Sequence, residues 1–295
     1  MIPISVVILT KNEARNIRRC LESLTGFDQI LVVDSASTDG TADMARQAGA
    51  EIVEFHWNGL YPKKKEWALH HPAVCNDWVL LLDADEIVTA ELRSEVARLF
   101  RSGPCHQGYF IEGRFVFLGR ALRFGHRNRK LALHDRRHTT FPRCPDLRSR
   151  GSWEVEGHYQ PIVDGSVGRL RSPLLHADGK PLFHWFDRHN LYSEWEADLA
   201  EGRRFSDLDA HEPFRRRLLK RLFRGAPFRP FLAFCHSYIW KLGILDGRAG
   251  FDFALCRAFY YWQIGLKRRA RMAEAGIEAG QHSPEADGGE LQQAD

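Results

Sequence analysis

The sequence predicts an α/β fold with parallel central strands, followed by a basic helical segment. Over the first hundred residues, short apolar runs alternate with segments of helical spacing, which is typical of βαβ units. Polar residues follow the ends of these runs, where open α/β sheets bind their ligands. From residue 213 onward, basic and aromatic residues are interleaved, and this pattern favours helices that contact an anionic surface.

The strands and helices follow from the apolar pattern in chain order. Residues 4–9 form a continuous apolar run, as expected for a strand covered on both faces. Residues 12–24 have helical spacing, with Ile17, Leu21 and Leu24 on one face. Between 108 and 176 the pattern is uneven and predicts irregular strands and loops over the cleft. The remaining strands are expected at 29–33, 51–55 and 78–82, and the remaining helices at 41–48, 90–100 and 183–200.

The composition is that of a globular protein, with 295 residues of which 44% are hydrophobic and 27% charged. A chain of this length can bury a core large enough to hold a cleft. The six cysteines form no C-x-x-C pair, which argues against a zinc ribbon, a redox motif or a secreted disulfide framework. Residues 1–10 lack the basic region and cleavage site of a signal peptide, and no apolar run is long enough to predict a transmembrane helix.

An acidic triplet directly follows the apolar run at 78–82. Asp83 and Asp85 are separated by one residue, and both are expected at the carboxyl end of a buried strand. Mg²⁺ and Mn²⁺ prefer oxygen ligands and typically use one or two protein carboxylates together with substrate phosphates. The triplet therefore predicts a site for a divalent cation and a diphosphate, although ordinary loop polarity would also explain it.

Three ordered motifs resemble those of the family 2 glycosyltransferases of GT-A fold. They are residues 6–13 (VVILTKNE), 30–41 (ILVVDSASTDGT) and 78–86 (WVLLLDADE). The resemblance covers roughly residues 1–200 and implies a mixed, Rossmann-like nucleotide-binding sheet flanked by helices. Within the family the sequence is similar to the bacterial branch that includes the lipopolysaccharide inner-core β-1,4-glucosyltransferases, on segments 64–69 (KKEWAL), 156–159 (EGHY) and 188–193 (RHNLYS).

The resemblance implies a role for each matching position. Thr10 and Glu13 would line the nucleotide pocket, and Asp34 would accept a hydrogen bond from the base of a sugar nucleotide. Asp83 would approach the ribose or the metal, while Asp85 would bind the Mg²⁺ or Mn²⁺ that bridges the diphosphate. Lys65 would lie near the nucleotide. His176 is a candidate for a position near the metal, and packing in the core is the alternative.

Inverting glycosyl transfer needs a base that removes a proton from the acceptor hydroxyl. Its transition state resembles an oxocarbenium ion, so a carboxylate is expected to face the cleft from the acceptor side. Glu156 is the favoured base, although an ordinary surface role would also fit it. The other candidates in this region are Glu154, His158 and Asp164. On the helix expected at 183–200, a further group on one face is a candidate for binding an acidic acceptor, namely Arg188, His189, Tyr192 and Glu196.

The C-terminal third is strongly basic. Residues 213–271 contain fourteen lysines and arginines but only two aspartates, interleaved with many aromatic residues. This pattern suits an interfacial helix on an anionic membrane, and no nucleic-acid-binding motif accompanies it. Packing on the catalytic domain or in a dimer interface is the alternative. The expected organisation is a GT-A domain at 1–212, a membrane-associating helical region at 213–275 and a disordered acidic tail at 276–295.

Together these patterns predict an inverting, metal-dependent glycosyltransferase on the cytoplasmic face of the inner membrane. The donor is expected to be a nucleotide sugar, in the first place a UDP-sugar, and the acceptor a lipid-linked or lipopolysaccharide-type saccharide. A sugar-nucleotide nucleotidyltransferase is the second hypothesis, but it would normally carry a glycine-rich loop after the first strand. A catalytically silent membrane scaffold is the third, and the intact Asp34, Asp83 and Asp85 argue against it.

Overall fold

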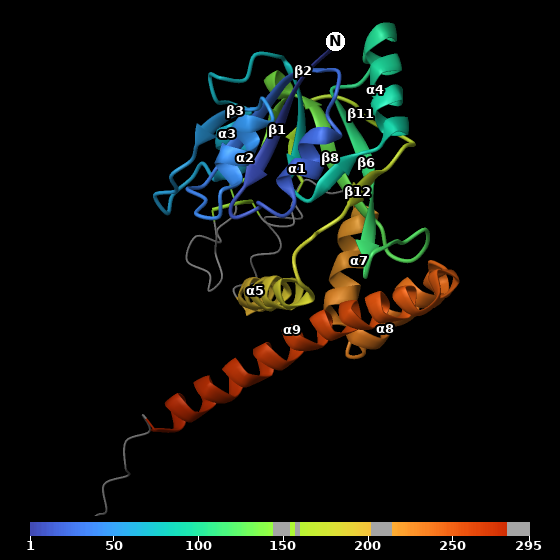
Figure 1. Cartoon of the computed structure of the whole chain (residues 1–295). Coiled ribbons are helices and arrows are strands. Elements are labelled where there is room, and N and C mark those ends of the chain that lie inside the picture. The colour runs from blue at the N-terminus through green and yellow to red at the C-terminus, as the bar shows by residue number, and fades with distance from the viewer. Residues whose placement is uncertain (144–153, 157–159, 202–213, 282–295) are drawn as a thin grey trace, which may run out of the picture.

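The computed structural model describes residues 1–143, 154–156, 160–201 and 214–281 (Figure 1). A mixed sheet with the strand order β3-β2-β1-β4-β8-β6-β12-β5 forms the centre, and β7 and β11 also pair with β6. The strands of this sheet are β1 (Ile2–Thr10), β2 (Phe27–Asp34), β3 (Glu51–Glu54), β4 (Trp78–Asp83), β5 (Glu86–Val88), β6 (Gly108–Phe117), β7 (Arg120–Ala121), β8 (Asn128–Asp135), β11 (Val167–Arg169) and β12 (Leu174–His176). A separate pair contains β9 (Thr139–Thr140) and β10 (Ile162–Val163).

Helices cover both faces of the sheet and its lower edge. They are α1 (Ile17–Glu22), α2 (Thr41–Gln47), α3 (Lys64–Leu69), α4 (Ala90–Ser102), α5 (Leu182–Glu201), α7 (Phe214–Gly225), α8 (Arg229–Cys235) and α9 (Gly247–Gln281). A π-helix at His236–Trp240 and a 3₁₀ helix at Gly243–Asp246 join α8 to α9. Within the part of the chain that the structure describes, no helix is both long and apolar enough to cross a bilayer.

The first half of the sheet confirms the predicted α/β fold. Strands β3, β2, β1 and β4 run parallel, and β1 lies between β2 and β4. The side chains of β1 alternate between two cores, with Val6 and Ile8 in one and Val7 and Leu9 in the other. Helices α1, α2 and α4 cover the first core and α3 covers the second. Because both faces are covered, the strands are apolar throughout, as the sequence pattern requires.

The prediction of irregular strands and loops over the cleft between 108 and 176 is wrong for the long strands β6 and β8, although β7 and β9 to β12 have only two or three residues each. Strand β6 has ten residues, lies inside the main sheet and pairs antiparallel with β8 and parallel with β12. Its glycines suggest a loop in the sequence, but here one of them permits close packing. A Cβ atom on Gly108 would lie 3.2 Å from Leu131 Cδ1 and 3.3 Å from Val163 Cγ2. Glycine in this strand therefore marks a tight approach and not a break.

The helices differ from prediction mainly at their starts. Helix α4 begins as predicted, because the Thr89 hydroxyl accepts a hydrogen bond from Leu92 N at 3.1 Å. The helix expected at 12–24 is shortened to α1, since Asn12 has a positive φ of 56° and its side chain accepts a hydrogen bond from Thr38 N at 2.9 Å. This cross-link holds the loops after β1 and β2 together. Helix α3 was not predicted.

The C-terminal helices lie beyond the carboxyl ends of the parallel strands (Figure 1). Helix α5 packs along α9 and is joined to it by ion pairs of Arg271 with Glu194 and of Arg271 with Asp198. Arg229 of α8 pairs with Glu196 of α5. The tail expected at 276–295 overlaps α9, which ends at Gln281, and residues 282–295 lie outside the described residues.

Candidate active site

The ends of three neighbouring strands bring the predicted nucleotide-binding residues together. In the sheet register, Thr10 at the end of β1 lies opposite Asp34 at the end of β2, and Leu9 lies opposite Asp83 at the end of β4. The carboxyl ends of parallel strands are where open α/β sheets bind ligands. The polar residues that the sequence placed at strand ends therefore occupy one edge of one sheet.

Asp34 is buried and held by its neighbours. Its Oδ1 accepts hydrogen bonds from the Thr10 hydroxyl at 2.7 Å and the Ser37 hydroxyl at 2.6 Å, and its Oδ2 accepts one from Ser37 N at 2.8 Å. These donors fix the orientation of the carboxylate before any ligand arrives. Such preorganisation lowers the cost of binding.

Lys64 is a residue of this site that the sequence interpretation missed. Its Nζ donates to Thr10 O and to the Ser35 hydroxyl, both at 2.6 Å, and lies 3.6 Å from Glu154. Burial lowers the pKa of Lys64 to about 8, against the opposing influence of the Glu154 and Asp34 charges. The sequence signal was a run of adjacent lysines, but without the register of α3 nothing showed which of them points to the strand ends.

Lys65, the predicted basic residue, points in a different direction from Lys64. Its Nζ donates to the Glu156 carbonyl oxygen at 3.1 Å. Burial lowers the pKa of Lys65, and the nearby charges of Asp83 and Glu156 partly restore it. Lys65 therefore lies between the carboxylate at the end of β4 and the candidate base.

Asp83 is partly exposed and forms an ion-pair cluster with two residues to which the sequence interpretation assigned no role. Lys130 Nζ lies 2.9 Å from Asp83 Oδ2 and 2.7 Å from Glu86 Oε2. Burial alone would raise the pKa of Asp83, but the charges of Lys130 and Lys65 outweigh it and lower that pKa. Burial does raise the pKa of Glu86, against the influence of Lys130. No local sequence signal marks Lys130, because strand β8 reaches the site only through long-range pairing.

Asp85 differs from Asp83 because one of its oxygens has no protein partner. Its Oδ2 lies 3.3 Å from His176 Nε2 and 3.5 Å from Arg188 Nη1. Its Oδ1 is buried and accepts no hydrogen bond. The backbone is fixed, since Ala177 N donates to Asp85 O at 2.7 Å and β12 pairs with β5. A buried carboxylate oxygen without a donor is rare, and a bound ion or an ordered water at Oδ1 would supply the missing partner.

The four residues predicted to share one face of the helix at 183–200 lie on two sides of α5. Arg188 faces the site and pairs with Asp85 and with Asp178 at 2.5 Å. Tyr192, one turn further, is close enough for the Arg188 and Asp83 charges to influence it, and burial raises its pKa to about 12. Glu196 instead pairs with Arg229 and accepts a hydrogen bond from the Tyr260 hydroxyl at 2.9 Å. The His189 ring stacks on Trp185 at 3.6 Å.

Glu13 lies in a polar network that joins α1 to the loop before α5. Its Oε1 accepts a hydrogen bond from Lys180 Nζ at 2.6 Å, and its Oε2 accepts one from Asn16 Nδ2 at 2.8 Å. Burial raises the pKa of Glu13, although Lys180 and Asn16 oppose the change. Asn16 also donates to Asp178 at 3.0 Å. Glu13 therefore helps to position the segment that carries Arg188 to Asp85.

Glu156, the predicted base, lies at the beginning of α3. Its two carboxylate oxygens accept hydrogen bonds from Lys65 N at 2.7 Å and Glu66 N at 2.8 Å. A carboxylate in this place stabilises the positive end of the helix dipole. Burial raises the pKa of Glu156, against the influence of Lys65 and these amides. Of the other candidates, Glu154 contacts Lys11 at 3.5 Å on the nucleotide side, Asp164 is exposed beside β10, and His158 lies outside the described residues.

Residues 5–150 match the profile described as Glycosyl transferase family 2. The chain is 30% identical over 212 residues to an uncharacterized glycosyltransferase of Rickettsia typhi, which covers 69% of this chain and 70% of the relative. The chain belongs to glycosyl transferase family 2. The resemblance stated from three motifs is thus confirmed, and so are the expected GT-A fold and glycosyltransferase class.

A second relative matches almost the whole chain. The lipopolysaccharide core biosynthesis glycosyltransferase LpsC of Rhizobium meliloti is 26% identical over 289 residues, covering 93% of this chain and 97% of the relative. Among solved structures, glucosyl-3-phosphoglycerate synthase from Mycobacterium tuberculosis, in complex with Mn²⁺, UDP and glucosyl-3-phosphoglycerate, is 26% identical with a TM-score of 0.31. That match covers 38% of this chain and 44% of the solved chain, less than two thirds of its length.

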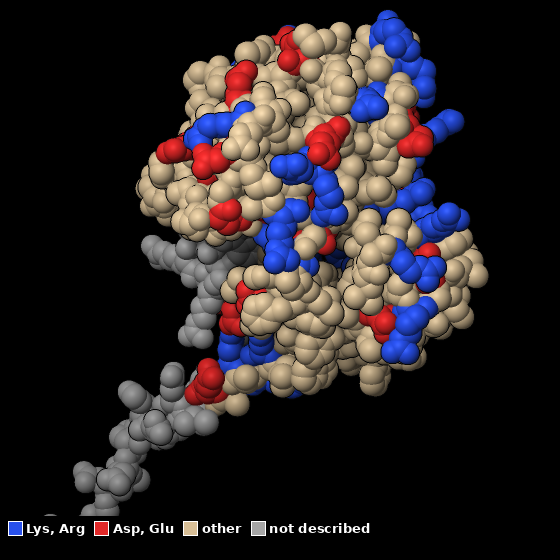
Figure 2. Space-filling view, viewed as in Figure 1, with Lys and Arg blue, Asp and Glu red and all other residues tan. Residues whose placement is uncertain are grey.

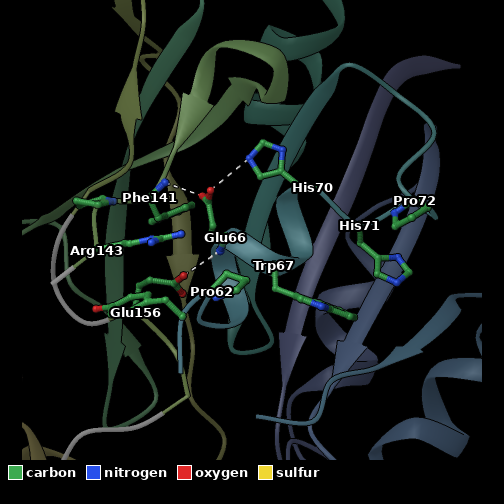
Figure 3. Close-up of a pocket in the computed structure, with 11 residues that line it drawn as sticks. Pro62, Glu66, Trp67, His70, His71, Pro72, Phe141, Arg143 and Glu156 are labelled. Carbon is green, nitrogen blue, oxygen red and sulfur yellow. Dashed lines mark hydrogen bonds and ion pairs between the residues drawn. The ribbon is translucent and has the colours of Figure 1, made fainter. Parts of the chain in front are cut away.

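A cavity of about 320 Å³ lies on the outer side of α3 in this family 2 glycosyltransferase (Figure 3). The Arg143 side chain extends between the carboxylates of Glu66 and Glu156. Glu66 accepts a hydrogen bond from Phe141 N at 2.6 Å, which holds one wall in place. The remaining lining residues are Tyr61, Pro62, Trp67, His70, His71, Pro72, Phe141 and Pro142. Aromatic rings with flanking carboxylates can pack against and hydrogen-bond a sugar.

Proposed function

We propose that this protein is an inverting, metal-dependent glycosyltransferase that transfers a sugar from a nucleotide sugar, in the first place a UDP-sugar, to a lipid-linked or lipopolysaccharide-type saccharide. We place this reaction at the cytoplasmic face of the inner membrane. The observation that carries the proposal is the unpartnered Oδ1 of Asp85, beside His176 and Arg188 and next to the strand ends that hold Thr10 and Asp34.

The nucleotide is proposed to lie over the ends of β1 and β2. Asp34 accepts a hydrogen bond from the base, while Lys64 holds the β1 and β2 ends together through Thr10 O and the Ser35 hydroxyl. Asp83 lies next to this position and is oriented by Lys130. These side chains have their own protein partners, so they require little reorganisation when the ligand binds.

Asp85 and His176 fit a divalent cation. Mg²⁺ typically takes one or two protein ligands and completes its shell with phosphate oxygens and water. No group of three or more His, Cys, Asp or Glu side chains that could hold a metal occurs among the residues described, which agrees with a site that the substrate completes. When bound, Mg²⁺ or Mn²⁺ would neutralise charge on the diphosphate.

The protein's own cations are proposed to stabilise the departing diphosphate. Arg188 projects from α5 toward Asp85, and Lys65 lies between Asp83 and Glu156. Positively charged groups fixed near developing negative charge lower the barrier, because no reorganisation is needed during the reaction. Tyr192, which is half-buried one turn along α5 from Arg188, helps to shield this position from water.

Glu156 is proposed to remove the proton from the acceptor hydroxyl, with the acceptor sugar in the cavity beside α3. Burial raises the pKa of Glu156, which makes it a better base than an exposed glutamate. The N–H groups of Lys65 and Glu66 orient the carboxylate while leaving lone pairs for the hydroxyl. After the proton transfer, the protonated Glu156 is neutral and compatible with its buried surroundings.

The membrane assignment rests on the C-terminal helices. Helix α7 exposes a row of apolar side chains between arginines, namely Phe214, Leu218, Leu219 and Leu222. An amphipathic basic helix of this kind lies in the headgroup layer of an anionic bilayer. The relative LpsC is named for lipopolysaccharide core biosynthesis and aligns with 93% of the chain, which supports an acceptor of that class.

The purified full chain can be tested with a panel of UDP-sugars, Mg²⁺ or Mn²⁺, and detergent-dispersed lipopolysaccharide acceptors. We expect metal-dependent UDP release that increases with acceptor, and a product whose anomeric configuration is opposite to that of the donor. Formation of a sugar nucleotide from a nucleoside triphosphate would instead support a nucleotidyltransferase. Absence of turnover with every nucleotide sugar in the presence of both cations would support the silent scaffold.

A further inference from the structure

Four basic side chains meet where the loop before β8 packs on the C-terminal helices. His126 comes from this loop, His236 and Lys241 come from the π-helix and the residue after it, and Arg257 comes from α9. The segments converge close to the end of β6 (Figure 1). On the visible face, basic side chains also gather where the sheet meets the C-terminal helices (Figure 2).

Backbone contacts hold the loop against these helices. Gly125 N donates to Lys241 O at 2.8 Å, and a Cβ atom on Gly125 would lie 3.7 Å from Ser237 O. Gly125 also has a φ of 74°, which favours glycine. His126, the next residue, is therefore fixed beside His236 and Lys241.

An aromatic ring joins this cluster to α9 and to the active site. The Phe115 ring stacks with His126 at 6.5 Å and lies 5.0 Å from the ring of Phe253, which precedes Arg257 by one helical turn. The same ring lies 5.3 Å from the ring of His176. The basic cluster is thus separated from a proposed metal ligand by one phenylalanine.

The cluster contains no acidic side chain that balances its charge. Among the described residues, none of the four basic groups forms an ion pair, and Arg257 Nε is buried without a hydrogen-bond partner. Burial and the surrounding positive charges lower the pKa values of His126 and His236. His126 and Arg257 are half-buried, whereas His236 and Lys241 are exposed. The observation that favours an anion is therefore the buried Arg257 Nε, because a bound anion would supply its missing hydrogen-bond acceptor.

The nearby acidic groups are engaged elsewhere. Both carboxylate oxygens of Asp246 accept backbone hydrogen bonds, from Arg123 N at 3.0 Å and Phe124 N at 2.8 Å. Asp252 pairs with Arg248 on the same helix. These aspartates are the only acidic residues between 213 and 271, so the helices supply no further counter-charge.

The surroundings of the cluster show what kind of molecule carries the anion. Large apolar side chains next to Lys241 are exposed to solvent, with Trp240 78% and Leu245 61% exposed. Exposed apolar groups beside basic ones suit the boundary between headgroups and acyl chains. Lys241 and Arg257 are charged, and a bound anion would favour protonation of the two imidazoles, whose neutral forms are otherwise favoured. Such a group of donors matches a phosphate monoester, which carries close to two negative charges near neutral pH.

We propose that His126, His236, Lys241 and Arg257 bind a phosphate monoester on the membrane-held acceptor. This binding site deepens the proposed function. It rests on that function in one respect, namely that the acceptor is held in a membrane by its lipid part. Binding there would hold the acceptor one phenylalanine ring away from His176, with its lipid part along the exposed apolar side chains near Trp240.

The test compares Arg257→Gln with Arg269→Gln in the full chain. Arg269 lies on the same helix, is exposed and has no described acidic partner, so both variants lose one positive charge from α9. Flotation is measured with phosphatidylcholine vesicles that contain either phosphatidic acid, a phosphate monoester, or phosphatidylglycerol, a phosphate diester. Thermal melting of each variant establishes that it is folded, and Lys241→Gln is the second cluster variant.

We expect Arg257→Gln and Lys241→Gln to weaken binding to phosphatidic acid vesicles about tenfold more than Arg269→Gln does, because a charged hydrogen bond to phosphate is lost. On phosphatidylglycerol the three variants should behave alike. If the cluster variants lose equal binding on both lipids, the proposal is overturned, and the basic residues contribute only through general surface charge.

Competition with inorganic phosphate separates the two sources of the anion. If the site takes a lipid-held phosphate, millimolar phosphate should only partly displace the wild type from phosphatidic acid vesicles. Complete displacement would show a site for free phosphate and overturn the lipid-held assignment. The same vesicle-binding measurements can be made on variants that also carry Asp85→Asn. Because vesicle binding needs no turnover, the result does not depend on whether the protein is a glycosyltransferase of the proposed kind.

Discussion

Arg188 Nη1 lies 3.5 Å from Asp85 Oδ2, so a helix beyond the strand ends contributes a cation to the acidic turn after β4. Arg188 also pairs with Asp178, which Asn16 and the Lys180 backbone hold in place. The opposite side of α5 is anchored to α8 and α9 through Glu196 and its neighbours. The C-terminal helices therefore determine where this arginine lies in the site.

Replacing Arg188 tests whether it stabilises the leaving diphosphate. Arg188→Gln is expected to lower kcat about a hundredfold, because a fixed cation near developing charge is lost. Arg188→Lys should recover only part of this loss, since lysine cannot contact Asp85 and Asp178 with two separate nitrogens. Steady-state kinetics with saturating donor measure the effect. Unchanged kcat in Arg188→Gln would exclude this role.

Replacing Asp85 tests the cation site. Asp85→Asn should reduce transfer about a thousandfold, because the amide cannot supply a charged oxygen ligand in place of Oδ1. Manganese binding, followed by electron paramagnetic resonance in the presence of UDP, should be lost in parallel. The matched control is Asp43→Asn, which removes an exposed carboxylate from α2. Retained manganese binding in Asp85→Asn would contradict the assignment.

The sequence correctly predicted the positions of the residues that lie at the ends of strands. Thr10, Asp34 and Asp83 each end an apolar run, so a parallel sheet suffices to bring them together. Asp85 is two residues further on and follows from the same reasoning. The family resemblance supplied the chemistry, because local pattern alone does not distinguish a binding edge from an ordinary polar loop.

The partners of these residues could not be predicted, because they arrive through long-range packing. Lys130 reaches Asp83 only because β8 pairs antiparallel with β4 and β6, inside a segment expected to be irregular. Lys64, and not the predicted Lys65, contacts the strand ends. Which lysine does so depends on the rotation of α3 about its axis, and α3 has only six residues. The capping contacts of Glu156 depend on the same helix.

Replacing Glu156 separates a base from a helix cap. Glu156→Gln keeps the shape and an oxygen acceptor but removes the basic carboxylate, so we expect kcat to fall at least about a hundredfold. The KM for the donor should change little, and the acidic limb of the kcat–pH profile should disappear. Loss of one of the two capping contacts should lower the free energy of unfolding by up to about 1 kcal/mol. If Glu156→Gln is less stable but keeps the wild-type kcat, Glu156 is only a helix cap and not the base.

His134 is predicted to make the fold sensitive to acid. Its ring lies in β8, fully buried, and neither nitrogen has a hydrogen-bond partner. Burial, assisted by the Lys130 charge, lowers the pKa of His134 to about 3. The unfolded chain binds this proton near pH 6.5, so stability is complete above that pH and falls as the pH decreases toward 3.

The measurement for His134 is urea unfolding across this range of pH. In His134→Leu, the dependence of the unfolding free energy on pH should be shallower by up to about 1.4 kcal/mol per pH unit below pH 6. His56→Gln, which removes an exposed histidine, should leave the slope unchanged. Equal slopes for wild type and His134→Leu would mean that His134 is protonated or partnered in the folded protein.

The apolar row on α7 is predicted to anchor the protein to anionic bilayers. Leu219 is 67% exposed and is flanked by basic residues on the same helix, so its side chain is free to enter the headgroup layer. Leu219→Glu should weaken sedimentation with phosphatidylglycerol vesicles about tenfold or more, because it removes buried apolar area and adds charge repulsion. The control is Leu60→Glu, which changes a leucine of similar exposure (59%) on the sheet domain and should bind as the wild type does. If both variants bind equally and analytical ultracentrifugation shows that Leu219→Glu dissociates a dimer, the row on α7 is a subunit interface and not a membrane contact.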